Sequence, residues 1–429
     1  MTKRSIIPAY YLIVDLGEII SQFYLLYISD KFQIEVFGPV EITSDVLKAE
    51  KANTYFESAI LELQKISNRK IISRNLILLL NSPSKGINGV SFAGKKDLNS
   101  NIGILKSFNL YSQKEVFDLL LSLLESFNSD FYVIDIGLTD VFYGYVDKNH
   151  NHRSFVKGVR ESLLEILGDP LSLDKIASLL PFEIDLKELG NYIANKSVYL
   201  QTIPLNLRDF TVEQSLIREI VSRDKVDFFR NEQLNKVILS GLWMKMATSV
   251  EQIVLTMIDG LELTGISYLY FDRHNLLRNC APIIFDYEEK TKNLVLPQLI
   301  SHYGTVITLL GPIVKGKNIG KVYLDQGLDE KQEITLMGGE IYTLPFTGKM
   351  KLTFVLDFMY GIFDTNSVLN KAKEERTIEI EVVGGEKGII LDVRGRPITV
   401  VGGREGKKQI LSWNQAFDIY HKVQKVGED

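Results

Sequence analysis

The N-terminal part of the chain alternates short apolar runs with polar turns. Residues 11–16 form a β-rich apolar run, which a Gly-Glu pair then interrupts. A second apolar run covers residues 22–29, and an Asp-Lys pair separates it from a third run at 32–37. Runs of this length with turn residues between them predict consecutive antiparallel strands.

A similar pattern returns later in the chain. Residues 44–67 and 113–127 have the apolar spacing of helices, and residues 75–81 form a strand-like run between them. Residues 132–136 and 141–146 then repeat the order strand, acid, glycine, turn and strand. Two copies of one supersecondary unit predict two related lobes.

Helical and strand patterns alternate after the second copy, and the pattern changes near residue 296. We expect helices at 155–167, 174–180, 185–195, 211–222 and 249–257, and strands at 237–239 and 266–271. Beyond residue 296, glycine becomes frequent and short β-rich runs alternate with turns as far as residue 393. This part predicts a sandwich or barrel module, and residues 410–423 are expected to form a closing helix.

Composition narrows the classes of protein that the chain can belong to. The 429 residues include 49 Lys and Arg against 54 Asp and Glu, a net charge of -5, so the whole chain has no attraction to nucleic acid. The single cysteine, Cys280, excludes an intrachain disulfide and is expected to be a buried thiol. No run reaches the roughly 20 apolar residues of a membrane span, and we expect a cytoplasmic protein.

Three turns carry residues that could approach a nucleotide. An acid at a strand end can hold Mg²⁺ through water, while glycines and hydroxyl residues in the next turn bring backbone N–H groups close to phosphates. The candidates, by turn, are Asp15 and Gly17; Asp135, Gly137 and Thr139; and Ser240 and Gly241. Asp15 and Asp135 would hold magnesium only if a nucleotide binds. Asp and Gly are also ordinary hairpin residues, so each motif alone is weak.

Several longer segments resemble a known family. They are Ser178-Leu179-Leu180-Pro181-Phe182-Glu183-Ile184-Asp185, Tyr192-Ile193-Ala194-Asn195-Lys196, Thr202-Ile203-Pro204, residues 213–219 and residues 384–398. In order and spacing they are similar to the glutamate mutase accessory protein MutL (GlmL) family of the actin-like ATPase superfamily. The resemblance implies an actin-like ATPase fold and a chaperone or reactivation role for a cobalamin-dependent mutase.

The resemblance and the two repeated units together predict the fold class. We expect an α/β protein with an actin-like (ribonuclease H-like) two-lobed fold and a C-terminal β-rich appendage. The expected domains are lobe I at 1–130, lobe II at 131–295, the appendage at 296–405 and a C-terminal helix at 406–429. Asp15 and Asp135 should then lie at strand ends facing one cleft, with Gly241 lining it.

The chain departs from the family in each of the three turns. Glu18 stands where a hydroxyl residue is usual, and its carboxylate would face phosphate oxygens. Leu138 takes a small-residue position in the second turn, and Leu242 and Trp243 follow Gly241 where small residues are usual. These changes predict a degenerate nucleotide site, with no cofactor expected; ATP and magnesium would bind only if the site is functional.

Three functions remain open at this point. The leading hypothesis is a non-catalytic assembly or scaffold protein that acts through a protein partner, and the second is an ATP-dependent chaperone of the mutase-accessory type. A sugar or small-molecule kinase is third, because no polar substrate constellation stands out. Arg394 and Arg396 could form an anion site, but a tight turn at Gly395 flanked by solvated arginines is preferred. The sequence does not determine the oligomeric state.

Overall fold

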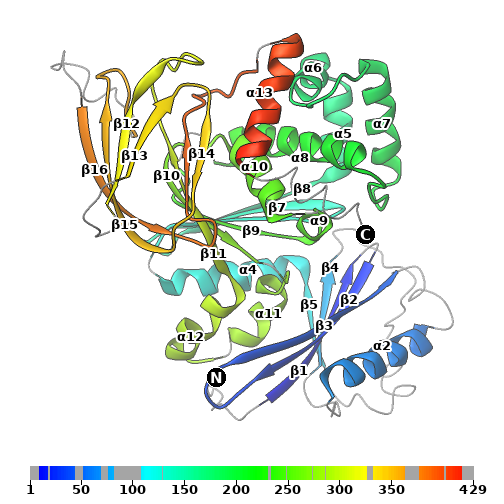
Figure 1. The fold of residues 1–429 in the computed structure, drawn as a ribbon. Helices are drawn as coiled ribbons and strands as arrows, with labels where there is room; N and C mark the ends of the chain where they lie inside the picture. Colours follow the sequence, from blue (N-terminus) through cyan, green and yellow to red (C-terminus); the bar gives the residue numbers. More distant parts are fainter. Residues whose placement is uncertain are drawn as a thin grey trace. The chain divides into compact units, whose positions relative to one another are not determined.

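The computed structural model describes residues 9–17, 20–43, 52–68, 76–81, 108–127, 129–229, 233–247, 249–272, 274–285, 287–325, 332–362, 376–400 and 402–417. The chain divides into two compact units (Figure 1). Unit 1 comprises Met1–Ser129, Gly144–Arg153 and Asp272–Ile300, and unit 2 comprises Asp130–Tyr143, Ser154–Phe271 and Ser301–Asp429.

Unit 1 is built on a five-stranded sheet with the order β3-β2-β1-β4-β5. The strands β1, β2 and β3 pair antiparallel, as predicted, and β4 and β5 continue the sheet parallel to β1. Their bounds are β1 Ala9–Gly17, β2 Ile20–Ile28, β3 Ile34–Thr43, β4 Leu76–Asn81 and β5 Phe108–Ser112.

Helices cover both faces of this sheet. On one face, Ala59, Ile60 and Leu63 of α2 (Ala52–Ser67) share a core with alternate residues of β1. The helix α4 (Gln113–Leu124) begins at a capping box formed by Ser112 and Glu115, and it packs against α11. The other helices in the described part of unit 1 are the 3₁₀ turn η1 (Glu125–Phe127), α11 (Leu277–Ile284) and α12 (Glu289–Leu299).

Unit 2 contains an eight-stranded sheet with the order β14-β17-β11-β10-β9-β6-β7-β8. The strands β6, β9 and β10 run parallel, whereas β11 runs antiparallel to β10. The bounds are β6 Phe131–Ile136, β7 Asp140–Val146, β8 His152–Gly158, β9 Lys236–Ser240, β10 Gly265–Phe271, β11 Ser301–Thr308, β14 Ile341–Leu344 and β17 Ile389–Asp392.

The order β8-β7-β6-β9-β10 in unit 2 repeats the order β3-β2-β1-β4-β5 of unit 1. In unit 1, the central strand β1 pairs parallel with β4, which pairs parallel with β5. In unit 2, the corresponding strand β6 pairs parallel with β9, which pairs parallel with β10. This duplicated ribonuclease H-like order is the actin-like fold. The predicted fold class is therefore confirmed by the strand order itself.

Several helices of unit 2 begin at side-chain caps that the sequence supplies. Asp169 caps α6, Asp185 caps α7 and Asn206 caps α8, because each side chain accepts a hydrogen bond from a backbone N–H of the first turn. The helices are α5 Val159–Leu167, α6 Pro170–Ser178, α7 Leu186–Val198, α8 Leu207–Phe228, α9 Leu242–Met246, α10 Val250–Leu261 and α13 Gly403–Ala416. In the described part of the chain, no helix has both the length and the apolar character that crossing a bilayer requires.

The β-rich appendage belongs to unit 2 and consists of one antiparallel sheet with the order β13-β12-β15-β16. Its strands are β12 Asn318–Asp325, β13 Gln332–Met337, β15 Gly348–Leu356 and β16 Arg376–Gly384 (Figure 1). Three strands expected in this module, β11, β14 and β17, instead extend the large sheet, and β11 pairs parallel with β17. Both sheets share one hydrophobic core, so the appendage is continuous with the lobe.

Two local predictions are corrected by the structure. Residues 155–158 belong to β8 rather than to the first turn of a helix, because β8 alternates exposed and half-buried side chains as an edge strand does. The two arginines beside Gly395 are not solvated: the side chains of Arg394 and Arg396 are only 1% and 10% exposed. Gly395 itself has φ +86°, which fits the predicted tight bend.

The buried arginines form a charge network that joins β17, α10 and α8. Asp392, at the end of β17, accepts hydrogen bonds from Arg394 at 2.8 Å and 2.9 Å and from Arg396 at 2.9 Å. Arg394 also lies 2.8 Å from Asp259 of α10, which pairs with Arg218 of α8 at 3.0 Å. The network therefore anchors the last strand of the large sheet to two helices.

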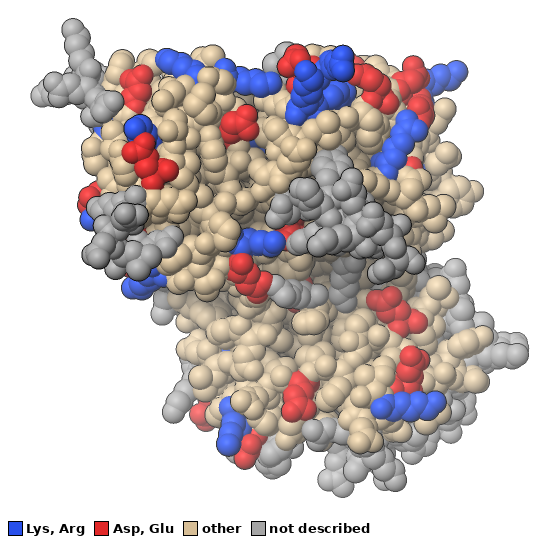
Figure 2. Space-filling view, viewed as in Figure 1, with Lys and Arg blue, Asp and Glu red and all other residues tan. Residues whose placement is uncertain are grey.

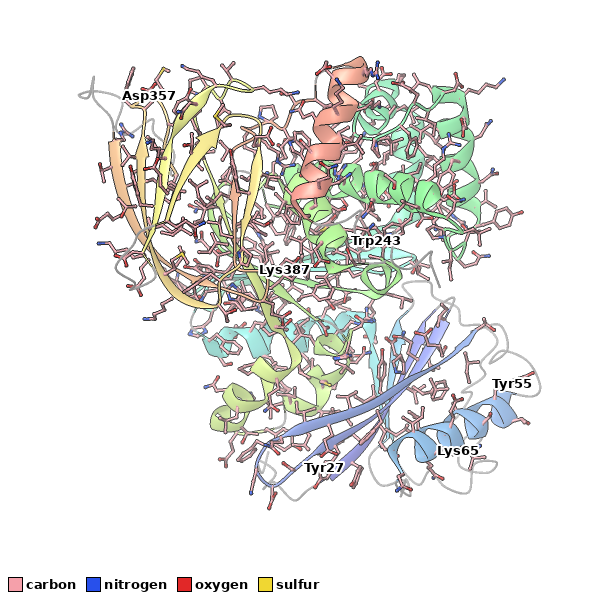
Figure 3. The ribbon with its side chains drawn as sticks, viewed as in Figure 1. Tyr27, Tyr55, Lys65, Trp243, Asp357 and Lys387 are labelled. Atoms are coloured by element: carbon pink, nitrogen blue, oxygen red, sulfur yellow. The ribbon has the colours of Figure 1, made fainter. Side chains whose placement is uncertain are left out.

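Two contacts of Trp413 tie the helix α13 to the rest of unit 2. The guanidinium of Arg394 lies over the ring of Trp413, 4.8 Å from its centroid, and the Trp413 indole N–H donates to the Gly339 carbonyl at 2.8 Å. Lys387, labelled in Figure 3, forms an ion pair with the buried Glu251 of α10. On the face drawn in Figure 2, in contrast, basic and acidic side chains are scattered among uncharged ones.

We predict that Asp392→Asn destabilises the protein by about 3–5 kcal/mol, because it removes the buried carboxylate that pairs with both Arg394 and Arg396. Chemical unfolding followed by the fluorescence of the adjacent Trp413 measures this change. The matched control is Glu379→Gln, which breaks the exposed 2.7 Å pair with Lys351 and should cost about 1 kcal/mol or less. Equal effects of the two variants would contradict a structural role for the network.

The Asp392 carboxyl should also make the stability of the protein depend on pH. Burial alone would raise the pKa of Asp392, but the guanidinium groups of Arg394 and Arg396 outweigh burial and hold this pKa well below its ordinary value. The unfolded chain therefore takes up a proton here at a pH where the folded protein does not, so stability is retained above about pH 4 and falls below it. Asp392→Asn should lose this part of the acid dependence.

Candidate functional site

The first candidate residue, Asp15, is placed by the alternation of side chains along β1. Leu12, Val14 and Leu16 pack into the core under α2, so Asp15 points to the opposite face of the sheet. There its carboxylate accepts a hydrogen bond from the guanidinium of Arg278 at 2.9 Å. Both side chains are buried, with 5% and 8% of their surface exposed. Asp15 is thus one half of a buried ion pair.

Arg278 is held in position by its own helix, α11. The carboxylate of Asp272 accepts hydrogen bonds from the backbone N–H groups of Leu276 and Leu277, both at 2.9 Å, and so fixes the start of α11. The guanidinium of Arg278 also lies 5.6 Å from the centre of the Phe117 ring on α4. A cation over an aromatic face gains further electrostatic stabilisation, so the arginine is doubly fixed.

The candidates of the second and third turns come together in unit 2. The strands β6 and β9 pair parallel, and Asp135 lies opposite Ser240 in their register. Gly241 follows directly, with φ +112°, and a Cβ built on it would lie 2.2 Å from the carbonyl oxygen of Ile136. Glycine is therefore required at position 241 by the approach of two backbones, whether or not a ligand binds.

Backbone hydrogen bonds hold the turn between β6 and β7 in place. The backbone N–H of Gly137 donates to the carbonyl of Asp140 at 2.8 Å, and the Val159 N–H donates to the Thr139 carbonyl at 2.8 Å. The carboxylate oxygen Oδ1 of Asp140 lies 2.9 Å from the position of a Cβ on Gly137. The turn thus carries a buried negative group beside its glycine.

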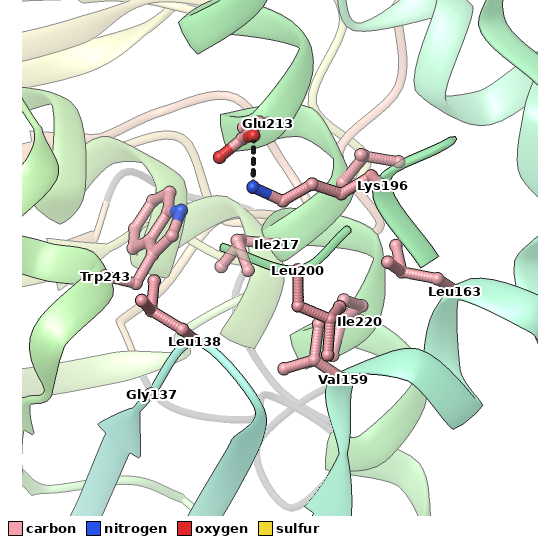
Figure 4. A pocket seen from close by; sticks show the side chains of 11 residues that line it. Gly137, Leu138, Val159, Leu163, Lys196, Leu200, Glu213, Ile217, Ile220 and Trp243 are labelled. Atoms are coloured by element: carbon pink, nitrogen blue, oxygen red, sulfur yellow. Dashed lines mark ion pairs between the residues drawn. The ribbon is translucent and has the colours of Figure 1, made fainter. Parts of the chain in front are cut away.

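A pocket opens beside this turn, within unit 2 (Figure 4). Leu138 of the turn and Trp243 of α9 contribute to its wall. The polar side chains in its lining are Lys196 of α7 and Glu213 of α8, whose Nζ and Oε1 atoms are 2.6 Å apart. Apart from Trp243 and Gly137, the rest of the lining is aliphatic.

Lys196 and Glu213 form a buried pair, and each also makes a hydrogen bond to a neighbouring group. Lys196 also donates to the Thr202 carbonyl at 2.6 Å, and the Tyr192 hydroxyl donates to Glu213 at 3.3 Å. Burial raises the pKa of Glu213, and the ammonium of Lys196 opposes that rise. The pair therefore presents a nearly neutral polar patch in an apolar wall.

The structure brings five of the seven predicted site residues together, namely Asp135, Gly137, Thr139, Ser240 and Gly241. The other two, Asp15 and Gly17, belong to unit 1, so a common cleft for Asp15 and Asp135 stays a prediction. Glu18 lies outside the described residues. Among the described residues, no group of three or more His, Cys, Asp or Glu side chains could hold a metal ion.

Sequence reasoning missed the partner of Asp15. Arg278 lies 263 residues further along the chain, in an apolar stretch that we interpreted only as the surroundings of the buried thiol Cys280. A charged residue inside an apolar run was the one available signal, because such a residue needs a buried counter-charge. Lys196 and Glu213 belong to the segments that resemble the family, but nothing in the sequence around either residue indicates that the two form an ion pair.

Comparisons with known proteins give distant structural likenesses. No protein-family model and no curated protein matches the chain. Among solved structures, the chain is similar to the ethanolamine utilization protein EutJ of Carboxydothermus hydrogenoformans (12% identity, TM-score 0.37, covering 65% of this chain and 90% of that one). It is also similar to component A of (R)-2-hydroxyglutaryl-CoA dehydratase from Acidaminococcus fermentans (14%, 0.37, 66% and 99%) and to the archaeal actin homolog Ta0583 (12%, 0.27, 59% and 97%). Likenesses this distant carry no functional argument.

We predict that Gly241→Ala destabilises unit 2 by roughly 3 kcal/mol or more, because the new methyl group meets the backbone of β6 at a positive φ. Gly190→Ala is the matched control: nothing lies within 4 Å of a Cβ at this position in α7. It should stabilise the protein by about 0.5–1 kcal/mol, since alanine favours a helix. Urea unfolding of both variants measures the difference, and a silent Gly241→Ala would refute the packing role.

Proposed function

We propose that this chain is a non-catalytic actin-fold protein that acts through a protein partner. The residues at the position of the fold's nucleotide site then stabilise the structure instead of binding a nucleotide. The observation that carries the proposal is the ion pair between Asp15 and Arg278. Asp15 is the carboxylate that would hold magnesium in unit 1, and a buried guanidinium already neutralises it.

Binding Mg²⁺ at Asp15 would place a divalent cation beside that guanidinium. Two like unit charges 4 Å apart repel by roughly 4 kcal/mol at an effective dielectric constant of 20, and a divalent ion repels more strongly. Displacing Arg278 would instead leave a buried cation unpaired, at a cost of about 3–5 kcal/mol. Either route opposes metal binding.

The turns of unit 2 support the same proposal. Phosphate binding needs backbone N–H donors and no nearby negative charge, but the Gly137 N–H is engaged by Asp140, whose carboxylate lies against the same glycine. Leu138 and Trp243 then place apolar surface where a polar nucleotide would need hydrogen-bond partners.

A partner-binding role is supported by exposed apolar side chains in the segment between α7 and α8. Val198 at the end of α7 and Tyr199, Ile203 and Leu205 after it are exposed, and Leu205 is 93% exposed. Exposed apolar residues gathered in one segment are typical of protein interaction surfaces.

The alternative function is an ATP-dependent accessory protein of the glutamate mutase MutL type. It is favoured by the register that places Asp135 opposite Ser240 at the ends of β6 and β9, with Thr139 in the turn that follows β6. In that case the cofactors would be ATP and magnesium, and a cobalamin-dependent mutase would be the partner.

Isothermal titration with Mg-ATP distinguishes the two functions. We expect no binding and no hydrolysis by the wild-type protein. Micromolar binding that disappears in Asp135→Ala would overturn the proposal and favour the ATP-dependent accessory protein. A thermal shift gives an independent reading, because a ligand at 100 times its Kd stabilises a protein by about 2.7 kcal/mol.

The partner is tested by affinity purification from native cells, comparing the wild type with Ile203→Asp. A protein that the wild type captures and the variant loses supports the proposed surface. Lys187→Asp, an exposed change on α7, serves as the charge control. Equal recovery in all three preparations would contradict a role for this segment.

A further inference from the structure

The pocket beside the β6–β7 turn is small, and its size limits what it can hold (Figure 4). It offers about 30 Å³ of space to a ligand. One water molecule needs about 10–15 Å³ of such space, whereas small-molecule sites hold about 300–1,000 Å³. The pocket therefore has room for one or two water molecules and is too small for a sugar, a nucleobase or an aliphatic chain.

A buried hydrogen-bond donor lines this pocket without a protein partner. Trp243 is 3% exposed, and nothing among the described residues accepts a hydrogen bond from its indole N–H. The ring stacks on Phe210 with 6.3 Å between centroids, which holds the plane of the indole. Figure 4 shows the indole nitrogen turned toward Lys196 and Glu213. A buried donor left without an acceptor is costly, so we expect the pocket to supply one.

The ion pair in the lining has hydrogen-bonding capacity left over. Lys196 and Tyr192 both contact the same oxygen of Glu213, Oε1, at 2.6 Å and 3.3 Å, so Oε2 can still accept. The ammonium of Lys196 has three N–H donors, and Glu213 and the Thr202 carbonyl take one each. One acceptor on Glu213 and one donor on Lys196 therefore remain.

Water is the ligand that matches these groups. It can accept from the indole N–H of Trp243 and from the third N–H of Lys196, and it can donate to Oε2 of Glu213. Three hydrogen bonds are the usual number for a buried water molecule. An anion would face the Glu213 carboxylate and a cation would face the Lys196 ammonium, so either ion is disfavoured.

We propose that this pocket is a binding site for an ordered water molecule, which links the Trp243 indole on α9 to Glu213 on α8 and Lys196 on α7. The water holds Trp243 in the wall beside the β6–β7 turn and leaves the pocket no room for a larger ligand. The site holds water whether or not the protein acts through a partner, so its test is independent of the proposed function.

High-resolution crystallography of the full-length protein locates the water. We expect an ordered water molecule within about 2.7–3.2 Å of both Nε1 of Trp243 and Oε2 of Glu213. Trp413 is the matched control, because its indole is as deeply buried but donates directly to the Gly339 carbonyl at 2.8 Å; we expect no water at its Nε1. An indole N–H of Trp243 that meets a protein acceptor, an ion or no density at all would overturn the inference.

Filling the pocket tests the site in solution. Leu138→Phe adds bulk to the pocket wall, whereas Leu138→Met, the matched control, nearly conserves the volume. Nuclear magnetic resonance should detect magnetisation transfer from water to the Trp243 indole proton, assigned with Trp243→Phe, in the wild type and in Leu138→Met but not in Leu138→Phe. No transfer in the wild type, or transfer that survives in a folded Leu138→Phe, would contradict the proposal. If Leu138→Phe does not fold, the wild-type spectrum and the crystal structure decide.

Discussion

The ion pair between Asp15 and Arg278 is the interaction on which this account of the molecule depends. A carboxylate at the end of a buried strand needs either a metal ion, a hydrogen-bond donor or a buried cation. In unit 1 the cation is Arg278 on α11. The Asp272 carboxylate accepts hydrogen bonds from backbone N–H groups at the start of that helix, and the guanidinium lies over the Phe117 ring. The group that could have served a magnesium ion instead fixes a helix to the sheet.

In unit 2, too, the residues predicted to form the nucleotide site have structural roles. Gly241 is demanded by the backbone of Ile136, and the turn at Gly137 is closed by Asp140, so the glycines have structural reasons to be there. Leu138 and Trp243 then form part of an apolar wall beside a neutral ion pair. The actin-like strand order is retained while the groups beside it support packing.

The sequence predicts the parts of this structure that rest on local pattern. The antiparallel start of each sheet, the buried Cys280 and the short strands after residue 296 follow from apolar periodicity and turn residues. Pairings between distant segments left no such trace: Arg278 with Asp15, Arg394 with Asp259, and β17 with β11. The arginines beside Gly395 were therefore predicted to be solvated, although the fold buries them against Asp392 and Asp259.

A double-mutant cycle on Asp15 and Arg278 tests the central claim most directly. The free energies of unfolding of the wild type, Asp15→Asn, Arg278→Gln and the double variant give the coupling between the two side chains. The account predicts that Arg278→Gln costs about 3–5 kcal/mol and that the double variant recovers about 2 kcal/mol or more relative to the sum of the single changes. Additivity within about 0.5 kcal/mol would contradict it. Asp15 would then have no structural partner in Arg278, and its carboxylate would be available to a metal ion.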